Sequence, residues 1–208
     1  DGLIVKSTIN LNGIRIPFTL IAEMNRSVAS YIENVTGSEN FTLSLFQSSD
    51  LNTKDGRYDF KFDFGIEGFA EVKLNGALEG LDVVQLRKAS KADDIFAATE
   101  IWGEVSKELS IAAISLEYID DQLADIILAE TPDVSQLVMM SGFQIDMVLG
   151  QYPEQANQLK ASIKAFLEGK NSFKVSMNAQ TPVKIMDIQQ LFVSGDMANS
   201  ITVAFEAN

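Results

Sequence analysis

The chain has 208 residues, of which 46% are hydrophobic, and this is enough for one globular domain with a core of its own. Sixteen Lys and Arg residues against 29 Asp and Glu residues give a net charge of −13, and a surface of that sign repels nucleic-acid phosphates and anionic headgroups. Because the chain lacks Cys and His, cysteine nucleophiles, histidine-assisted triads and the usual His/Cys zinc sites are excluded. We therefore expect no nucleic-acid partner, no metal site and no cofactor.

Strand patterns dominate the first 80 residues. Apolar residues alternate on both sides of Asn12-Gly13, a dipeptide typical of type I′ turns, so we predict a β-hairpin there. Pro17 cannot donate to a sheet ladder, which indicates an edge position or a bulge. A shorter alternating run follows at 41–45, and the polar segment 50–56 is predicted to be a hairpin loop. A calcium loop does not fit that segment, because Lys54 stands where the third ligand would be.

The clearest strand of the chain covers residues 58–66, where an aromatic or apolar residue occupies every second position. One face carries an aromatic stripe, and the other carries Asp59, Lys61 and Asp63, which we interpret as a solvated face rather than a cation site. Another strand is predicted from Phe69 or Ala70 to Leu78. The stripe is either part of the core or the lining of a pocket for an apolar ligand. It consists of Tyr58, Phe60, Phe62 and Phe64.

The second part of the chain mixes helices and strands. Helix-like spacing covers 93–107, a strand pattern covers 109–118, and Asp120 or Asp121 could cap a helix that follows. Thr131-Pro132 is a typical helix start, and we expect that helix to reach Leu149. The remaining predictions are a helix from Pro153 to Gly169, a strand over 173–179, a short helix over 182–192 and a final strand over 201–205.

A loose internal repeat appears in this pattern. Residues 71–86 (EVKLNGALEGLDVVQL), 174–191 (KVSMNAQTPVKIMDIQQL) and 110–128 (SIAAISLEYIDDQLADIIL) each read as a strand, a turn and a helix. We therefore predict a single α+β domain over residues 1–208, with a strand-rich part at 1–80, a mixed part at 81–208 and a possible internal duplication. Its fold would be a curved, mainly antiparallel sheet with helices packed on one face.

No residue cluster predicts a catalytic centre. Asp93-Asp94 and Asp120-Asp121 precede predicted helices, so we interpret them as helix caps rather than acid/base pairs. A Ser–Lys dyad, such as Ser90 with Lys88 or Lys91, stays open as an alternative. No apolar run approaches the roughly 18 residues that cross a bilayer, so we expect any signal peptide or membrane anchor to lie outside this chain.

Apolar side chains are the better candidates for a binding site. Trp102 lies on the predicted helix 93–107, and Met139 and Met140 lie on the helix expected after Pro132. Methionine side chains adapt to irregular partners, although core filling is the simpler interpretation. Together with the aromatic stripe, they form our candidate apolar ligand-binding set: Tyr58, Phe60, Phe62, Phe64, Trp102, Met139 and Met140.

The C-terminal part of the chain resembles a family of proteobacterial envelope proteins of uncharacterised function. The resemblance is carried by LEYIDDQLAD at 116–125, AFLEGKNSFKV at 165–175 with Thr181-Pro182-Val183, and ITVAFEAN at 201–208, and it covers about residues 57–208. Asp125 stands where members often have a basic residue. The resemblance implies a periplasmic or envelope location and carries over no catalytic residue.

These observations favour a non-enzymatic bacterial envelope domain that binds an apolar, lipid-like ligand or another envelope protein. A hydrolase that uses carboxylates or a Ser–Lys dyad is one alternative. A purely structural scaffold domain is the other.

Overall fold

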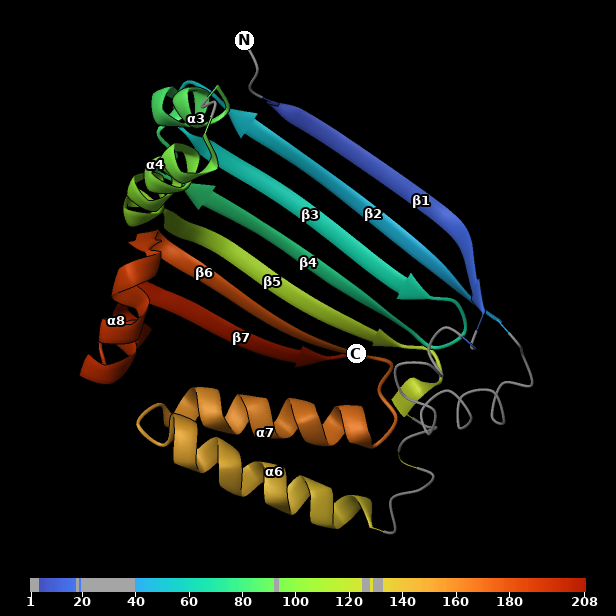
Figure 1. Ribbon diagram of the computed structural model, residues 1–208. Coiled ribbons are helices and arrows are strands. Elements are labelled where there is room, and N and C mark those ends of the chain that lie inside the picture. Colours follow the sequence, from blue (N-terminus) through green and yellow to red (C-terminus); the bar gives the residue numbers. More distant parts are fainter. Residues whose placement is uncertain (1–3, 18, 20–39, 92–93, 125–127, 129–132) are drawn as a thin grey trace.

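The structure, a computed structural model, describes residues 4–17, 19, 40–91, 94–124, 128 and 133–208. A seven-stranded antiparallel sheet forms the body of the protein, and its strands lie side by side in the order of the sequence (Figure 1). The sheet is curved and does not close. Its strands are β1 (Lys6–Pro17), β2 (Asn40–Asn52), β3 (Arg57–Ile66), β4 (Ala70–Glu79), β5 (Ser110–Asp120), β6 (Ser172–Lys184) and β7 (Ile201–Ala207). The predicted α+β class and antiparallel sheet are thereby confirmed.

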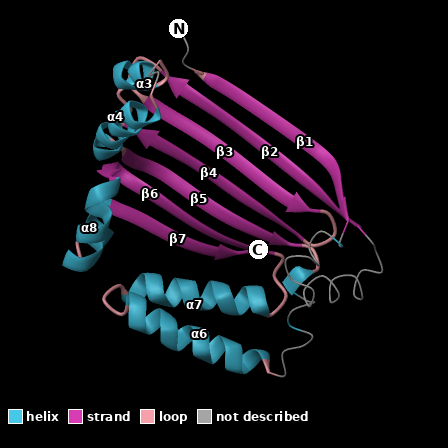
Figure 2. Ribbon diagram, viewed as in Figure 1, coloured by secondary structure: helices cyan, strands magenta, loops and turns pink. Residues whose placement is uncertain are grey.

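The helices come in groups between strands (Figure 2). Asp82 and Asp94 accept hydrogen bonds from the first-turn N–H groups of α3 and α4, as an N-cap carboxylate does. Asp133 caps α6 in the same way, whereas the predicted start signal, Thr131-Pro132, lies outside the described residues. The groups are α3 (Val83–Ala89) and α4 (Ile95–Glu108) after β4, α6 (Val134–Leu149) and α7 (Pro153–Leu167) after β5, and the 3₁₀ helix η1 (Ile185–Asp187) with α8 (Ile188–Ser194) and α9 (Met197–Ser200) after β6.

The hairpin predicted at Asn12-Gly13 is wrong. β1 runs through this dipeptide as one strand, and two of its residues oppose one residue of β2 between the pairs Leu11–Leu45 and Ile14–Leu43. The positive φ of Gly13, 71°, serves a β-bulge instead of a turn. One inserted residue exchanges the two faces of a strand, so Leu11 and Ile14 point to the same side of the sheet although their numbers differ in parity. Pro17 ends this strand, which lies at the sheet edge, as predicted.

The short helix predicted from Pro182 begins later. Pro182 belongs to β6, and helical structure starts at Ile185. Pairing of β6 with β5 jumps from Asn178 to Val183, so Pro182 lies in an irregular stretch where its missing N–H costs no ladder bond. The predicted internal duplication is a matter of sequence pattern and stays a prediction.

The register places almost all apolar strand residues on one face of the sheet. Directly opposed residues of antiparallel strands share a face, and the pairs Leu45–Phe64, Phe64–Val72 and Val72–Tyr118 connect four strands in one row. The row continues to Phe173 of β6 and Ala207 of β7. We call this side of the sheet the apolar face.

The opposite face is polar and carries a row of alternating charges. Asp63, Lys73, Glu117, Lys174 and Glu206 stand directly opposite one another from β3 to β7. Opposite charges at such positions contribute about 0.2–1 kcal/mol per pair, and like charges would destabilise. The row keeps like charges from standing opposite one another, while Asp63 and Lys73 form their ion pairs within their own strands, with Lys61 and Glu71, at 3.1 Å each.

Helices pack on the apolar face at its margins. Phe166 of α7 contacts Tyr118 and Phe173, with ring centroids 5.6 and 6.4 Å apart. At the other end of the strands, Leu86 of α3 and Val105 of α4 are buried with Leu51 of β2. Figure 1 shows α3, α4 and α8 along one end of the sheet and α7 beside β7, so the predicted packing of helices on one face is confirmed.

Candidate functional site

An apolar recess of about 520 Å³ lies where the ends of β2, β3 and β4 meet α3 and α4. Its lining contains two residues with hydroxyl groups, Tyr58 and Ser90, and otherwise apolar or aromatic side chains. No charged side chain belongs to it, so its chemistry suits an apolar ligand. The lining residues are Ile4, Leu51, Tyr58, Leu78, Leu81, Leu86, Ala89, Ser90, Trp102 and Leu109.

Backbone contacts hold the walls of the recess in place. The Leu81 N–H donates to the Gly56 carbonyl at 3.2 Å, which ties the β2–β3 turn to the segment that enters α3. Asp82 then caps α3 through the N–H groups of Val84 and Gln85. As a result, Leu86 and Ala89 face inward and are buried, and together with Leu51 they form a wall that the fold itself positions.

Two of the predicted binding residues, Tyr58 and Trp102, meet at this recess. They are far apart in sequence, and Trp102 remains 53% exposed. Phe60 follows Tyr58 on the apolar face, with ring centroids 6.0 Å apart, and its ring lies against Gly76, where a Cβ would stand 2.4 Å from it. Phe62 and Phe64 continue the same line along β3 and are partly buried.

The other two predicted residues, Met139 and Met140, do not join this group. Both lie on α6, which packs on α7, and α7 separates it from the sheet (Figure 1). Their side chains are exposed to solvent. The prediction of one apolar set therefore divides into two separate surfaces.

Sequence reasoning missed how far the apolar surface extends beyond the recess. Leu116 of β5 is 48% exposed, and Ile9, Leu11 and Ile14 of β1 are between 41% and 46% exposed. All four point to the apolar face. The period-two pattern of these strands was the available signal, but the bulge at Asn12-Gly13 hid the common side of the β1 residues.

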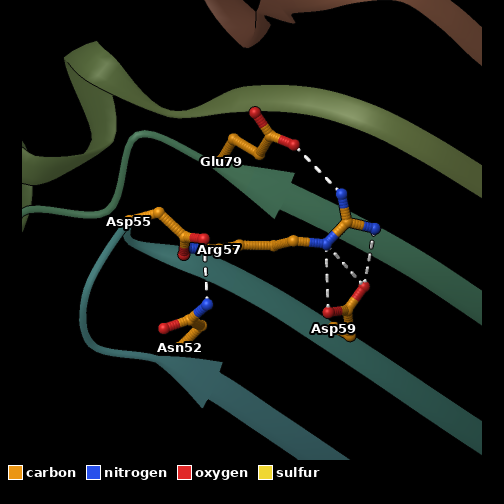
Figure 3. A network of polar contacts seen from close by, with 5 residues as sticks. All are labelled: Asn52, Asp55, Arg57, Asp59 and Glu79. Atoms are coloured by element: carbon orange, nitrogen blue, oxygen red, sulfur yellow. Dashed lines mark hydrogen bonds and ion pairs between the residues drawn. The ribbon is translucent and has the colours of Figure 1, made fainter.

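The polar and charged candidates, of which Ser90 alone lines the recess, have structural partners. The Ser90 hydroxyl donates to the Arg87 carbonyl at 3.0 Å, as expected at the end of a helix. Lys61 pairs with Asp63 at 3.1 Å on the polar face. Figure 3 shows that Arg57 joins Asp59 on its own strand and Glu79 on β4, with N–O distances of 3.0 and 3.1 Å. Such partly exposed ion pairs contribute little stability each.

Neither a metal cluster nor a membrane-spanning helix is found in the described part of the chain. No group of three or more acidic residues there is arranged to hold a metal ion. None of the helices described is long and apolar enough to cross a bilayer.

Asp120, the last residue of β5, binds Tyr118 and the backbone that follows the strand, while its predicted role as a helix cap stays a prediction. Its carboxylate accepts hydrogen bonds from the Tyr118 hydroxyl at 2.7 Å and from the Ala124 N–H at 2.8 Å. Burial, and then the hydrogen bond to Asp120, raise the pKa of the Tyr118 phenol above its ordinary value of 10.0. The protonated phenol is therefore favoured by the folded state.

We expect this shift to make the protein less stable in alkali. Above about pH 10 the unfolded chain releases the Tyr118 proton while the folded chain keeps it, so stability present below pH 10 is lost as the pH rises further. Urea unfolding at pH 8 and pH 11 should show a larger loss for the native protein than for Tyr118→Phe. Equal losses in the two proteins would contradict the assignment.

Comparison with known proteins places the chain in a family whose activity is uncharacterised. A family model described as "Uncharacterized protein" matches residues 63–208, which include the end of β3, the strands β4–β7 and all the helices named above, so the chain belongs to this family. No curated protein matches the chain. The predicted membership of a family of unknown function is confirmed, while its proteobacterial and envelope character stays a prediction.

Proposed function

We propose that this member of a family of uncharacterised proteins is a non-enzymatic bacterial envelope domain that binds an apolar, lipid-like ligand. The observation that carries the proposal is the apolar recess at the ends of β2, β3 and β4, together with the exposed apolar face that continues from it. A volume of about 520 Å³ falls within the usual range of small-molecule sites, about 300–1,000 Å³.

The composition of the recess favours an acyl chain over a polar ligand. Its lining offers mainly Leu, Ile and aromatic side chains, with hydroxyl groups on Tyr58 and Ser90 alone, which leaves few groups to orient a polar molecule. Each methylene moved from water into such a site contributes about 0.8 kcal/mol. We therefore expect affinity to increase with chain length until the recess is full, and a headgroup to remain at the solvent boundary.

The apolar face of the sheet continues from the recess and offers a binding surface for the part of a longer acyl chain that the recess cannot hold. Tyr58, Phe60, Phe62 and Phe64 extend from the recess along β3, and Leu116 lies exposed on β5. A large exposed apolar patch is unusual for a soluble protein without a ligand or partner. The envelope location is proposed from the resemblance of the C-terminal strands, and subcellular fractionation of the native host tests it.

Trp102 makes a direct test possible, because it is the single tryptophan of the chain and lines the recess. Dibromostearate should quench Trp102 fluorescence, since bromine atoms on the chain would come close to the indole ring. Unbrominated stearate should shift the emission to shorter wavelength without this quenching. Decanoate should bind more weakly than stearate by at least tenfold, as expected from the loss of buried methylenes.

A pair of variants locates the site. Ser90→Phe adds a ring at the lining of the recess and should weaken quenching at least tenfold, whereas Ser194→Phe on α8, which is also exposed, should bind as the native protein does. Absence of quenching below the concentration at which stearate forms micelles would overturn the proposal and favour the scaffold alternative. Equal binding by the two variants would place the ligand elsewhere.

A further inference from the structure

Helix α6 presents an apolar surface that the proposed ligand site does not use. Its inward side packs on α7, where Ile145 is buried and Asp146 pairs with Lys160. Its outward side carries large apolar side chains, and Figure 1 shows it as the outermost layer of the molecule. The exposed fractions are 69% for Met139, 52% for Met140, 69% for Phe143, 75% for Met147 and 62% for Val148. We call this surface the α6 stripe.

The spacing of the stripe is that of a helix-pairing seam. Met140, Phe143 and Met147 are separated by three and four residues, so they lie above one another on one side of the helix. Asp146 is the single charged residue of α6, and Lys160 already pairs with it. The stripe is therefore free of net charge on a protein whose total charge is −13.

A membrane surface fits this stripe poorly. Helices that lie in a bilayer interface carry Lys and Arg residues on their polar side, which attract anionic lipids. α6 has neither residue type, and the acidic protein would be repelled by anionic headgroups. An uncharged stripe needs an uncharged apolar partner, and flexible methionine side chains are suited to contact another helix.

A second copy of the chain supplies such a partner. In an antiparallel pair related by a twofold axis, Phe143 of each copy lies close to the axis and Met140 of one copy lies opposite Met147 of the other. The exposed stripe offers on the order of 600 Å² per copy, which approaches the roughly 800 Å² per partner of a standard interface. The charge of Asp146, which is 58% exposed beside the stripe, is already balanced by Lys160.

We propose that two copies of the protein associate through their α6 stripes in this antiparallel arrangement. The proposal is independent of ligand binding at the recess. Because each copy carries 13 negative charges, long-range repulsion opposes the dimer, and salt screens that repulsion. Association should therefore strengthen as ionic strength rises.

Sedimentation velocity over a series of protein concentrations, at 0.05 M and 0.5 M NaCl, tests the proposal. We expect a monomer–dimer equilibrium that is tighter at high salt. Phe143→Glu should weaken it at least tenfold, because two carboxylates would meet near the axis. Phe96→Glu, at a position on α4 that is 79% exposed, should leave it unchanged. A monomer at every concentration and both salt levels would overturn the proposal, as would equal effects of the two variants.

The absence of cysteine from the chain allows a second measurement. Phe143→Cys should form a disulfide-linked dimer on mild oxidation, since the twofold axis brings the two thiols together. Met186→Cys, at another exposed apolar position, should link far more slowly. Equal rates would contradict the geometry. Flotation of monomeric protein with phosphatidylcholine vesicles, lost in Phe143→Glu, would assign the stripe to a membrane instead and overturn the dimer.

Discussion

Gly56→Ala is expected to lower the free energy of unfolding by about 3 kcal/mol, from left-handed strain and a backbone clash together. Gly56 has a φ of +71° and is buried in the turn between β2 and β3. An added Cβ would stand 2.3 Å from the carbonyl oxygen of Leu81, which is backbone and cannot rotate away. Relief requires the turn to separate from the segment that enters α3, so the recess would open as well.

Gly68→Ala is the matched control. Its φ of +75° is almost the same, but no atom lies within 4 Å of the added Cβ. We expect a loss of about 1 kcal/mol, from the backbone conformation alone. Urea unfolding followed by circular dichroism measures both values. Equal losses would show that the approach of Leu81 to Gly56 is not the constraint inferred here.

Ile201→Ala and Leu116→Ala should differ strongly although both remove an aliphatic side chain from the apolar face. Ile201 is 2% exposed at the start of β7, whereas Leu116 is 48% exposed on β5. Truncation of a buried Ile leaves a cavity and costs about 2–5 kcal/mol. At Leu116 we expect a loss below about 1 kcal/mol, because water already reaches much of the side chain.

The same pair separates core from binding surface. Ile201→Ala should lower stability and leave the stearate affinity of the folded protein unchanged, since Ile201 is not part of the recess. Chemical unfolding gives the stability difference, and Trp102 quenching gives the affinity. A loss of several kcal/mol at Leu116 would mean that the middle of the apolar face is core, and the path proposed for a longer acyl chain would then be wrong.

The strands could be predicted where the residue pattern within the strand is enough to specify it. Residues 58–66 alternate strictly, and they form β3 almost residue for residue. The N-cap at Asp94 and the helix starting at Pro153 follow from local hydrogen-bonding and φ preferences. The prediction at Asn12-Gly13 failed because a positive φ at glycine serves a turn or a bulge equally well. Only pairing with β2, nearly thirty residues later, selects the bulge.

The candidate site also combines features that the sequence predicts with features that only the tertiary structure sets. The aromatic stripe on β3 and the position of Trp102 on a helix could be predicted from the sequence. That Tyr58 and Trp102 line the same recess could not. It depends on how α3 and α4 return to the strand ends through Gly56 and Leu81. By residue type, Met139 and Met140 were as good candidates for an apolar site as the aromatic residues. They are exposed to solvent because α6 packs on α7 and not on the sheet.

The sequence by itself determined the α+β class, the alternation that gives each strand one apolar and one polar side, and the lack of cysteine and histidine chemistry. These properties depend on residue type and on spacing within one element. The tertiary structure decided the register that aligns seven apolar strand faces and one row of alternating charges. It also decided which part of the apolar face the helices cover and which part stays open, because that depends on contacts between segments far apart in the chain.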